Sequence, residues 1–339
     1  MQKIILGMIF LCSLSFAQDS SSTTNNGYID IAHTAISEKT ETISVAIDDY
    51  IANKMDFFLS QPKEDNATEP DKVDALFQSE KFTNETRKSF LKFSTNLQYN
   101  SLDANNFTET VSANLALNRS NQRLKLFVNN LNYDNINDTT KQNDSTSNDT
   151  EVGLSVMQNI DKYITSKYSF GTRGFYPFTR ARFSYKKEIK NWLVEPVQSF
   201  EYSTKDHFRE YTILYFDKSL TDKVLFRVEF QRGTSAKISG MDYDSVLHLF
   251  WTPSSKEGWQ ISQGFYGNTK YLYTPSDGVS PSRVFAGINN YITQLTYRKN
   301  VLRPWFFVEL SPGVNFSKAH DFKANYRIFA KFDIIFGKI

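Results

Sequence analysis

KVLFRVEFQ, from Lys223 to Gln231, alternates apolar and polar side chains without interruption. Successive side chains of an extended strand point to opposite sides, so this pattern predicts a strand with one apolar and one polar face. A strand of a membrane-spanning β-barrel has this pattern because one face meets lipid and the other a polar interior. The two faces are Val224, Phe226, Val228 and Phe230 against Lys223, Arg227, Glu229 and Gln231.

The same two-residue period recurs along the chain after Arg87, for example in LKFSTNLQY (Leu91–Tyr99) and TVSANLALN (110–118). One such segment is a weak signal, but many together predict an all-β fold, an antiparallel transmembrane β-barrel over 87–339. We count about fourteen strands, and one miscounted hairpin would give twelve or sixteen. The segments are 87–100, 107–118, 122–134, 150–159, 162–174, 178–188, 191–203, 208–218, 222–234, 243–252, 258–268, 284–298, 304–316 and 322–336.

The connections between these segments support the count. Bacterial outer-membrane barrels have short periplasmic turns and longer outer loops. The three longest connections, 135–149, 235–242 and 269–283, are all odd-numbered, whereas the even-numbered ones, such as Leu220-Thr221, are tight. The even-numbered end is therefore expected to face the periplasm.

Composition agrees with a barrel. Aromatic residues make up 15% of the chain, yet the mean hydropathy is −0.46. A barrel combines these values because half of each strand faces a polar interior. The alternative is a soluble β-sandwich with an aromatic core. The net charge of +2 argues against a nucleic-acid binder.

The N-terminal residues have a different organisation. Residues 1–17 read as a secretory signal peptide, with Lys3, an apolar run and the small-x-small site before Gln18. The only cysteine, Cys12, lies within it, which leaves no disulfide, thiolate metal site or cysteine nucleophile in the exported chain. Residues 18–30 are expected to be disordered, 31–60 to form an amphipathic helical segment, and 61–86 a polar linker with room for one further helical turn.

The predicted helix has three open roles. Ile36, Ile43, Tyr50 and Phe57 fall seven residues apart, a spacing that suits pairing with other copies or with a periplasmic partner. The segment 31–60 could instead plug the barrel lumen, or lie against the inner leaflet of the outer membrane.

The four tryptophans all fall near even-numbered turns. Trp and Tyr gather at membrane interfaces because their rings are apolar while their N–H or O–H groups seek water. We therefore expect a girdle at one membrane interface, and outer-membrane lipids as the surroundings of the barrel. Its members are Trp192, Trp251, Trp259 and Trp305.

The last segment, YRIFAKFDIIF (Tyr326–Phe336), resembles the C-terminal signal of Gram-negative outer-membrane barrel proteins, which implies insertion by the barrel-assembly machinery. Gly337-Lys338-Ile339 follow the aromatic, a departure from the usual ending. AIDDYIANKMDFFLS, the linker and the strands LKFSTNLQY and NQRLKLFV are together loosely similar to an uncharacterised family of predicted exported proteins. That resemblance implies a porin-like fold rather than an activity.

The inward faces of the predicted strands carry mixed charge. Charged groups lining a pore set its ion selectivity, so basic residues at the mouth favour a passive pore for small polar or anionic solutes. The alternative is a ladder of ion pairs that only braces the lumen of a non-conducting barrel, which would anchor a periplasmic assembly or present surface loops. The candidate lumen residues are Arg173, Arg180, Arg182, Glu195, Glu201, Arg227, Glu229, Arg327, Lys331 and Asp333.

Catalytic and cofactor signals are weak. Asp206-His207 on a predicted outer loop makes a barrel hydrolase a distant alternative, but catalysis needs more groups in mutual reach. We expect no enzyme, no cofactor and no metal site. Asn66, with Glu64 two residues before it, resembles the extended sequon of bacterial N-glycosylation.

Overall fold

The computed structural model describes residues 27–54, 72–79, 81, 84, 86, 88–117, 124–130, 150–273 and 281–337. The predicted signal peptide, residue Asn66 and the whole of the loop 135–149 lie outside these residues. The chain divides into two compact units, Met1–Ile36 and Ser37–Ile339.

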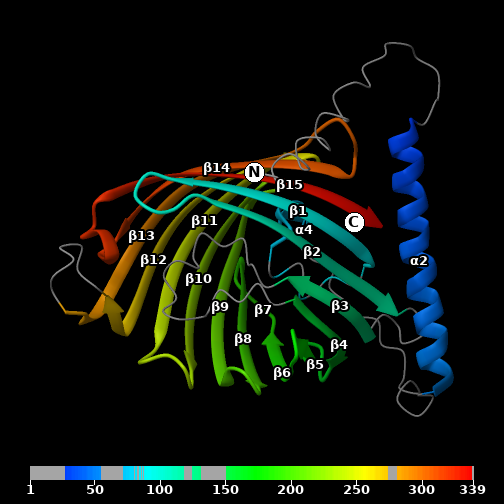
Figure 1. Ribbon diagram of the computed structural model, residues 1–339, viewed down its shortest axis with the longest axis horizontal. Helices are drawn as coiled ribbons and strands as arrows, with labels where there is room; N and C mark the ends of the chain where they lie inside the picture. Colours follow the sequence, from blue (N-terminus) through cyan, green and yellow to red (C-terminus); the bar gives the residue numbers. More distant parts are fainter. Residues whose placement is uncertain are drawn as a thin grey trace. The chain divides into compact units, whose positions relative to one another are not determined.

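The larger unit contains a closed antiparallel barrel of fourteen strands, which confirms the predicted fold (Figure 1). Every predicted segment coincides with a strand, and 178–188 covers both β6 and the short β7 that continues it. The strands are β1 (Phe90–Asn100), β2 (Asn106–Leu117), β3 (Leu124–Asn130), β4 (Thr150–Asn159), β5 (Ile164–Arg173), β6 (Tyr176–Tyr185), β7 (Lys187–Ile189), β8 (Trp192–Ser203), β9 (His207–Thr221), β10 (Val224–Ser235), β11 (Asp242–Ser254), β12 (Glu257–Tyr273), β13 (Arg283–Asn300), β14 (Phe306–Ser317) and β15 (Ala324–Gly337).

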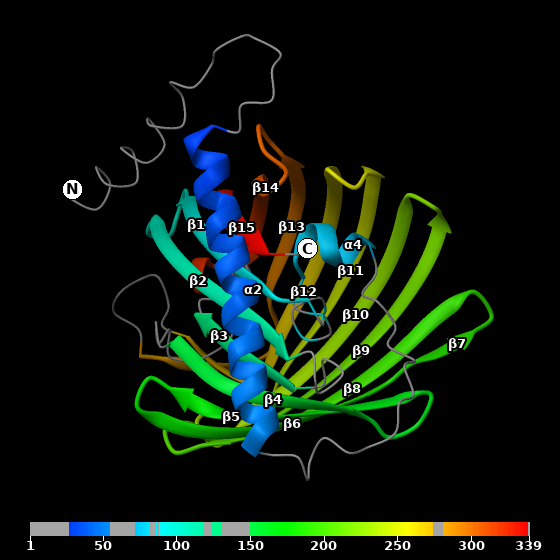
Figure 2. The same cartoon turned by 90° about the vertical axis from the view of Figure 1, so that its right-hand side faces the viewer.

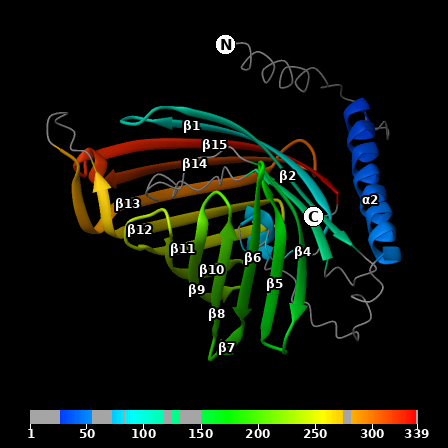
Figure 3. The same cartoon turned by 60° about the horizontal axis from the view of Figure 1, so that its bottom comes forward.

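Neighbouring strands in the chain pair with each other around the whole ring, apart from the insertion of β7 (Figure 3). The first strand, β1, pairs with the last, β15, in a register running from Phe90 opposite Gly337 to Asn100 opposite Arg327. β6 pairs with β8 directly. The pairing of β1 with β15 and of β6 with β8 closes the described strands into a ring, so most backbone groups of the wall are paired within it.

The two faces of each strand separate as the alternation predicts. In β10, Arg227 is 3% exposed, whereas Phe230, three residues further on and therefore on the opposite face, is 45% exposed. The buried face contains most of the charged side chains and therefore points into the barrel. The exposed apolar face forms its outer wall, as expected of a wall in contact with lipid.

One long helix precedes the barrel, α2 (Tyr28–Lys54). Its second part contacts the barrel through small polar residues: Ser44 Oγ donates to the carbonyl of Ala116 at 2.8 Å, and the Gly337 N–H donates to Ser37 Oγ at 3.2 Å. Ile43, by contrast, is 44% exposed. Ile43, a member of the predicted apolar stripe, is thus not on the face that meets the barrel, whereas Phe57 and the side chain of Tyr50 lie outside the described structure. None of the described helices is long and apolar enough to cross a membrane.

A short helix, α4 (Lys72–Phe77), forms within the range predicted to be a linker. Figure 2 shows α4 inside the ring of strands. Its neighbours are Phe90, Phe307 and Ile335 at the ends of β1, β14 and β15. The described residues between Lys72 and Thr86, here called the lumenal segment, therefore occupy the short-turn end of the barrel. A 3₁₀ turn, η2 (Lys318–His320), connects β14 to β15 at the opposite end.

Candidate functional site in the barrel lumen

The barrel encloses a cavity of about 350 Å3, lined by inward side chains from most of the ring and by the lumenal segment. Cationic side chains outnumber carboxylates in its lining, and three of these cations, Lys81, Arg180 and Arg227, are paired with carboxylates that are not part of the lining. Two carboxylates, Glu229 and Glu309, face it, against seven cationic side chains: Lys81, Lys92, Lys125, Lys167, Arg180, Arg227 and Lys331. Charge of one sign in a narrow, partly desolvated space raises the local concentration of counter-ions.

Arg227 of β10 fixes the lumenal segment to the wall. Its guanidinium binds both carboxylate oxygens of Asp74 in α4, at 2.7 and 3.0 Å. It also binds both oxygens of Asp217 on the adjacent strand β9, at 2.7 and 2.8 Å. All three side chains are buried. A buried guanidinium is tolerated when such two-pronged contacts satisfy it, and the planar fork makes the geometry specific.

Lys81 makes a second anchor. Its ammonium lies 2.9 Å from Glu195 of β8 and 3.1 Å from Asp217. Asp217 thus binds both Arg227 and Lys81, which joins the two anchors in one buried network. Removing one member would leave buried charge on the others uncompensated.

Opposite charge shifts the protonation of both anchors. Burial alone would raise the pKa of Asp74, but the Arg227 guanidinium outweighs it and holds that pKa below its usual range. Burial likewise opposes the charged form of Lys81, but Glu195 and Asp217 outweigh it and raise the pKa of Lys81 above its usual range. Both groups are therefore charged at neutral pH.

Apolar contacts hold the other sides of α4. Leu76 packs with Phe90, Phe307 and Ile335, and Val73 packs with Leu225 and Phe250. Gly258 of β12 provides the space. A Cβ at that position would lie 2.7 Å from Leu76 Cδ2 and 3.1 Å from the Phe77 ring.

The end of the lumenal segment binds the wall through uncharged oxygens. Lys125 of β3 donates to the carbonyl of Thr86, and Lys167 of β5 donates to Asn84 Oδ1 at 3.2 Å. Asn114 Nδ2 donates to the carbonyl of Lys88 at 2.9 Å, just before β1 begins. Polar side chains of the wall therefore hold the segment along its whole described length.

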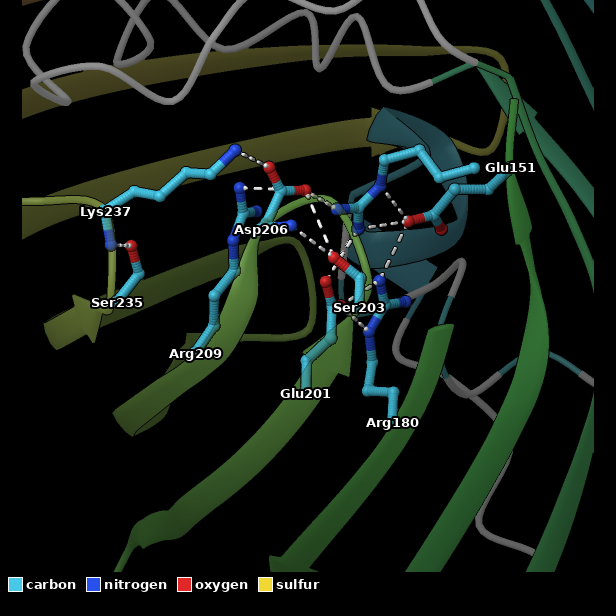
Figure 4. A network of polar contacts seen from close by, with 9 residues as sticks. Glu151, Arg180, Glu201, Ser203, Asp206, Arg209, Ser235 and Lys237 are labelled. Atoms are coloured by element: carbon cyan, nitrogen blue, oxygen red, sulfur yellow. Dashed lines mark hydrogen bonds and ion pairs between the residues drawn. The ribbon is translucent and has the colours of Figure 1, made fainter. Parts of the chain in front are cut away.

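A separate arginine cluster lies at the opposite end of the lumen (Figure 4). Arg173 binds Glu151 at 2.6 Å, Glu201 at 2.7 Å and Asp206 at 2.5 Å. Arg180 binds the same two glutamates, at 3.0 and 2.5 Å. The cluster ties β4, β5, β6 and β8 to one another on their inner face.

Asp206, in the connection between β8 and β9, joins this cluster to two further cations. Arg209 lies 3.4 Å and Lys237 3.2 Å from its carboxylate. Burial would raise the pKa of Asp206, but Arg209, Lys237 and Arg173 outweigh that effect and lower it. The neighbouring His207 is exposed, with φ at +59°. The two neighbouring side chains thus have different surroundings: the Asp206 carboxylate takes part in buried ion pairs, and the His207 imidazole is exposed.

The structure places the candidate lumen residues on inward faces. Nine of them are buried or line the cavity: Arg173, Arg180, Arg182, Glu195, Glu201, Arg227, Arg327, Lys331 and Asp333. Glu229 also lines it, with His248 Nε2 at 3.9 Å. Asp333 lies 2.6 Å from Arg298, and Arg327 donates to Asn100 Oδ1 at 3.0 Å.

Several functional candidates have no counterpart in the sequence prediction. Asp74 and Lys81 lie outside any strand, so the two-residue period gives no sign of them. Lys92, Lys125 and Lys167 do follow that period, on the polar faces of β1, β3 and β5, and could have been found by extending the inward face to every strand. Among the described residues, no group of three or more His, Cys, Asp or Glu side chains is arranged to hold a metal ion.

The tryptophans all lie at the short-turn end. Trp251 and Trp259 lie directly opposite each other on β11 and β12, and Trp259 packs against Tyr297 in a tilted arrangement with ring centroids 4.2 Å apart. Trp192 opens β8, and Trp305 directly precedes β14.

No family model matches the chain, and no curated protein matches it. Solved structures of outer-membrane barrels resemble it at low identity. OmpT of Vibrio cholerae, in a loop-deletion form, is 8% identical with a TM-score of 0.44 over 73% of this chain and 98% of that one. An anion-selective porin from Comamonas acidovorans is 8% identical, at 0.43 over 73% and 98%. OprB of Pseudomonas putida is 11% identical, at 0.42 over 79% and 100%.

Proposed function

We propose that the protein is an outer-membrane barrel that passes small polar solutes, preferentially anions, through a lumen controlled by the lumenal segment. The observation that carries the proposal is the excess of cationic side chains in the cavity lining inside a closed barrel: Lys92, Lys125, Lys167 and Lys331, beside the ion-paired Lys81, Arg180 and Arg227. Rings of basic side chains favour anions because they lower the electrostatic cost of entering a narrow pore. The tryptophans at the short-turn end, with strands of membrane-spanning length, support the membrane location.

The lumenal segment is the element that would control passage. It is fixed by charged contacts that can break and re-form, Asp74 with Arg227 and Lys81 with Glu195 and Asp217. The wall pair of Arg227 and Asp217 does not require the segment. Releasing the segment therefore leaves this pair within the wall in place, which is the property expected of a gate.

Single-channel recording in planar bilayers tests the proposal. Wild type is compared with the double variant Asp74→Asn/Lys81→Gln, which removes the two charges that anchor the segment but none of the wall. We expect low or intermittent conductance in wild type and larger, steadier conductance in the variant. Asp161→Asn, in the exposed turn between β4 and β5, is the matched control and should behave as wild type.

Ion selectivity provides the second reading. In a salt gradient the reversal potential should indicate anion preference, and Lys92→Gln/Lys331→Gln should shift it towards cations. The ion pairs in the lumen, such as Arg173 with Glu151 and Arg227 with Asp74, also favour a second function. In that function the barrel is non-conducting, is braced by its interior and anchors a periplasmic assembly. Silence in wild type and in the double variant, with both barrels folded, would reject the pore and leave that function. Hydrolytic activity has no support in the separated Asp206 and His207.

A further inference from the structure

The outer wall contains a polar cluster where an apolar surface is expected. Four side chains take part, and each lies on the outward face of its strand: Gln198 of β8, Glu210 and Thr212 of β9, and Arg232 of β10. The side chain of Arg232 is 54% exposed and that of Glu210 27%. We call these four residues the outer-wall cluster.

The four side chains form one hydrogen-bonded network. Thr212 Oγ1 donates to Gln198 Oε1 at 2.7 Å, and Gln198 Nε2 donates to Glu210 Oε1 at 3.2 Å. Arg232 donates through Nε to Thr212 Oγ1 at 3.1 Å and through Nη2 to Glu210 Oε1 at 2.9 Å. The network links three neighbouring strands across the outer surface.

Apolar side chains bracket the cluster along the strands. Phe200 and Phe208, stacked with centroids 6.4 Å apart, lie on one side of it, and Phe230, 45% exposed, lies on the other. On β8 the outward face runs from Trp192 to Tyr202, and Gln198 is between them. The cluster is therefore placed within the apolar band and not beyond it. Charged groups on a lipid-facing surface are destabilising, so this patch is suited to contact with protein.

The chemistry of the cluster is complementary to itself. It contains one cation and one anion, an amide and a hydroxyl, and its net charge is zero. Among the described residues, no hydrogen bond joins Arg232 Nη1 or Glu210 Oε2 to another group, and both side chains are partly exposed. A two-fold axis through such a patch would pair Arg232 of each copy with Glu210 of the other. An anionic lipid headgroup fits less well, because the Glu210 carboxylate would repel it.

We propose that the outer-wall cluster is the surface on which a second copy of this chain docks within the membrane. The proposal depends on the membrane location in the proposed function but not on conduction. Two features favour a second copy as the partner: the charge of the cluster is complementary to itself, and the cluster lies inside the apolar band.

Photo-crosslinking of the full chain in proteoliposomes tests it. A benzophenone amino acid replaces Phe230, next to the cluster, or Ile328, 48% exposed on β15, as the matched control. We expect a covalent dimer containing only peptides of this chain, with about tenfold more product from position 230. Equal yields, or crosslinks only to lipid or to another protein, would overturn the proposal.

Charge reversal distinguishes loss of docking from loss of folding, because a misfolded variant would not recover the dimer on mixing. Arg232→Glu and Glu210→Arg should each abolish the dimer, and mixing the two variants before reconstitution should restore it. Heat-modifiable migration in detergent gels confirms that each barrel is folded. Folded variants that retain the dimer singly, or that fail to form it when mixed, would contradict the pairing. Conductance is measured separately, so a silent but dimeric barrel would reject only the proposed function.

Discussion

Arg227 and Asp74 are 153 residues apart in the chain, yet their side chains meet through two hydrogen bonds of 2.7 and 3.0 Å in the barrel interior. The contact joins the wall to a segment that precedes the first strand. It therefore couples the folding of the lumenal segment to the completion of the barrel.

Asp74→Asn should destabilise the protein. The change leaves the buried Arg227 with Asp217 as its remaining anion, and a buried donor that loses its charged partner costs about 1–3 kcal/mol. Urea unfolding in detergent micelles, followed by tryptophan fluorescence, measures the effect. Asp161→Asn, in an exposed turn, should change the midpoint little. Equal midpoints for the two variants would show that the Asp74 contact contributes nothing.

Gly258→Val should displace α4. The added side chain would meet Leu76 and Phe77, which are themselves packed against the wall and have limited room to shift. Overpacking of this kind costs typically ~1–3 kcal/mol. Limited proteolysis should cut the lumenal segment faster in the variant than in wild type while the barrel resists. Gly27→Val, where a Cβ meets nothing within 4 Å, is the control.

Acid should weaken the protein partly through Asp206. The folded state lowers the pKa of this carboxyl, because Arg209, Lys237 and Arg173 outweigh its burial. A lowered pKa contributes stability above the unfolded value of about 4, and that stability is lost as pH falls through the folded value. Urea midpoints between about pH 6 and 3 should therefore fall less in Asp206→Asn than in wild type. Parallel curves would remove Asp206 from the acid response.

The tryptophans should report a membrane interface. Because they gather at one end of the barrel, lipids brominated near the headgroup should quench their fluorescence more than lipids brominated near the chain ends. Variants that each keep one of Trp192, Trp251, Trp259 and Trp305 would assign the depth residue by residue. Stronger quenching by deep bromines would contradict the predicted girdle.

The sequence predicts the wall far better than its contents. In KVLFRVEFQ, each residue's position in the pattern states which face it occupies, so Arg227 could be assigned to the interior from its neighbours alone. The partner of Arg227 could not be assigned, because ion pairs across a lumen depend on which strands the ring brings together.

The lumenal segment cannot be predicted from the sequence for a related reason. KVDALF is too short for a helical period to stand out, and its surroundings are polar, so the range 61–86 reads as a linker. Arg227 on a distant strand orders Asp74, and Glu195 and Asp217 on distant strands order Lys81. Helix α2 shows the opposite case: its apolar spacing is visible in the sequence, but Ser37 and Ser44 make its contacts with the barrel.

The pairing of β1 with β15 has a consequence for biogenesis. β1 is synthesised first, but the backbone hydrogen bonds on one of its edges, from Phe90 to Asn100, form only when β15 is available. Contacts so distant in sequence form slowly, and an unsatisfied edge invites aggregation in the meantime. Chains truncated before Ala324 should therefore leave β1 unpaired on that side, so the ring can close only after the final strand has been made.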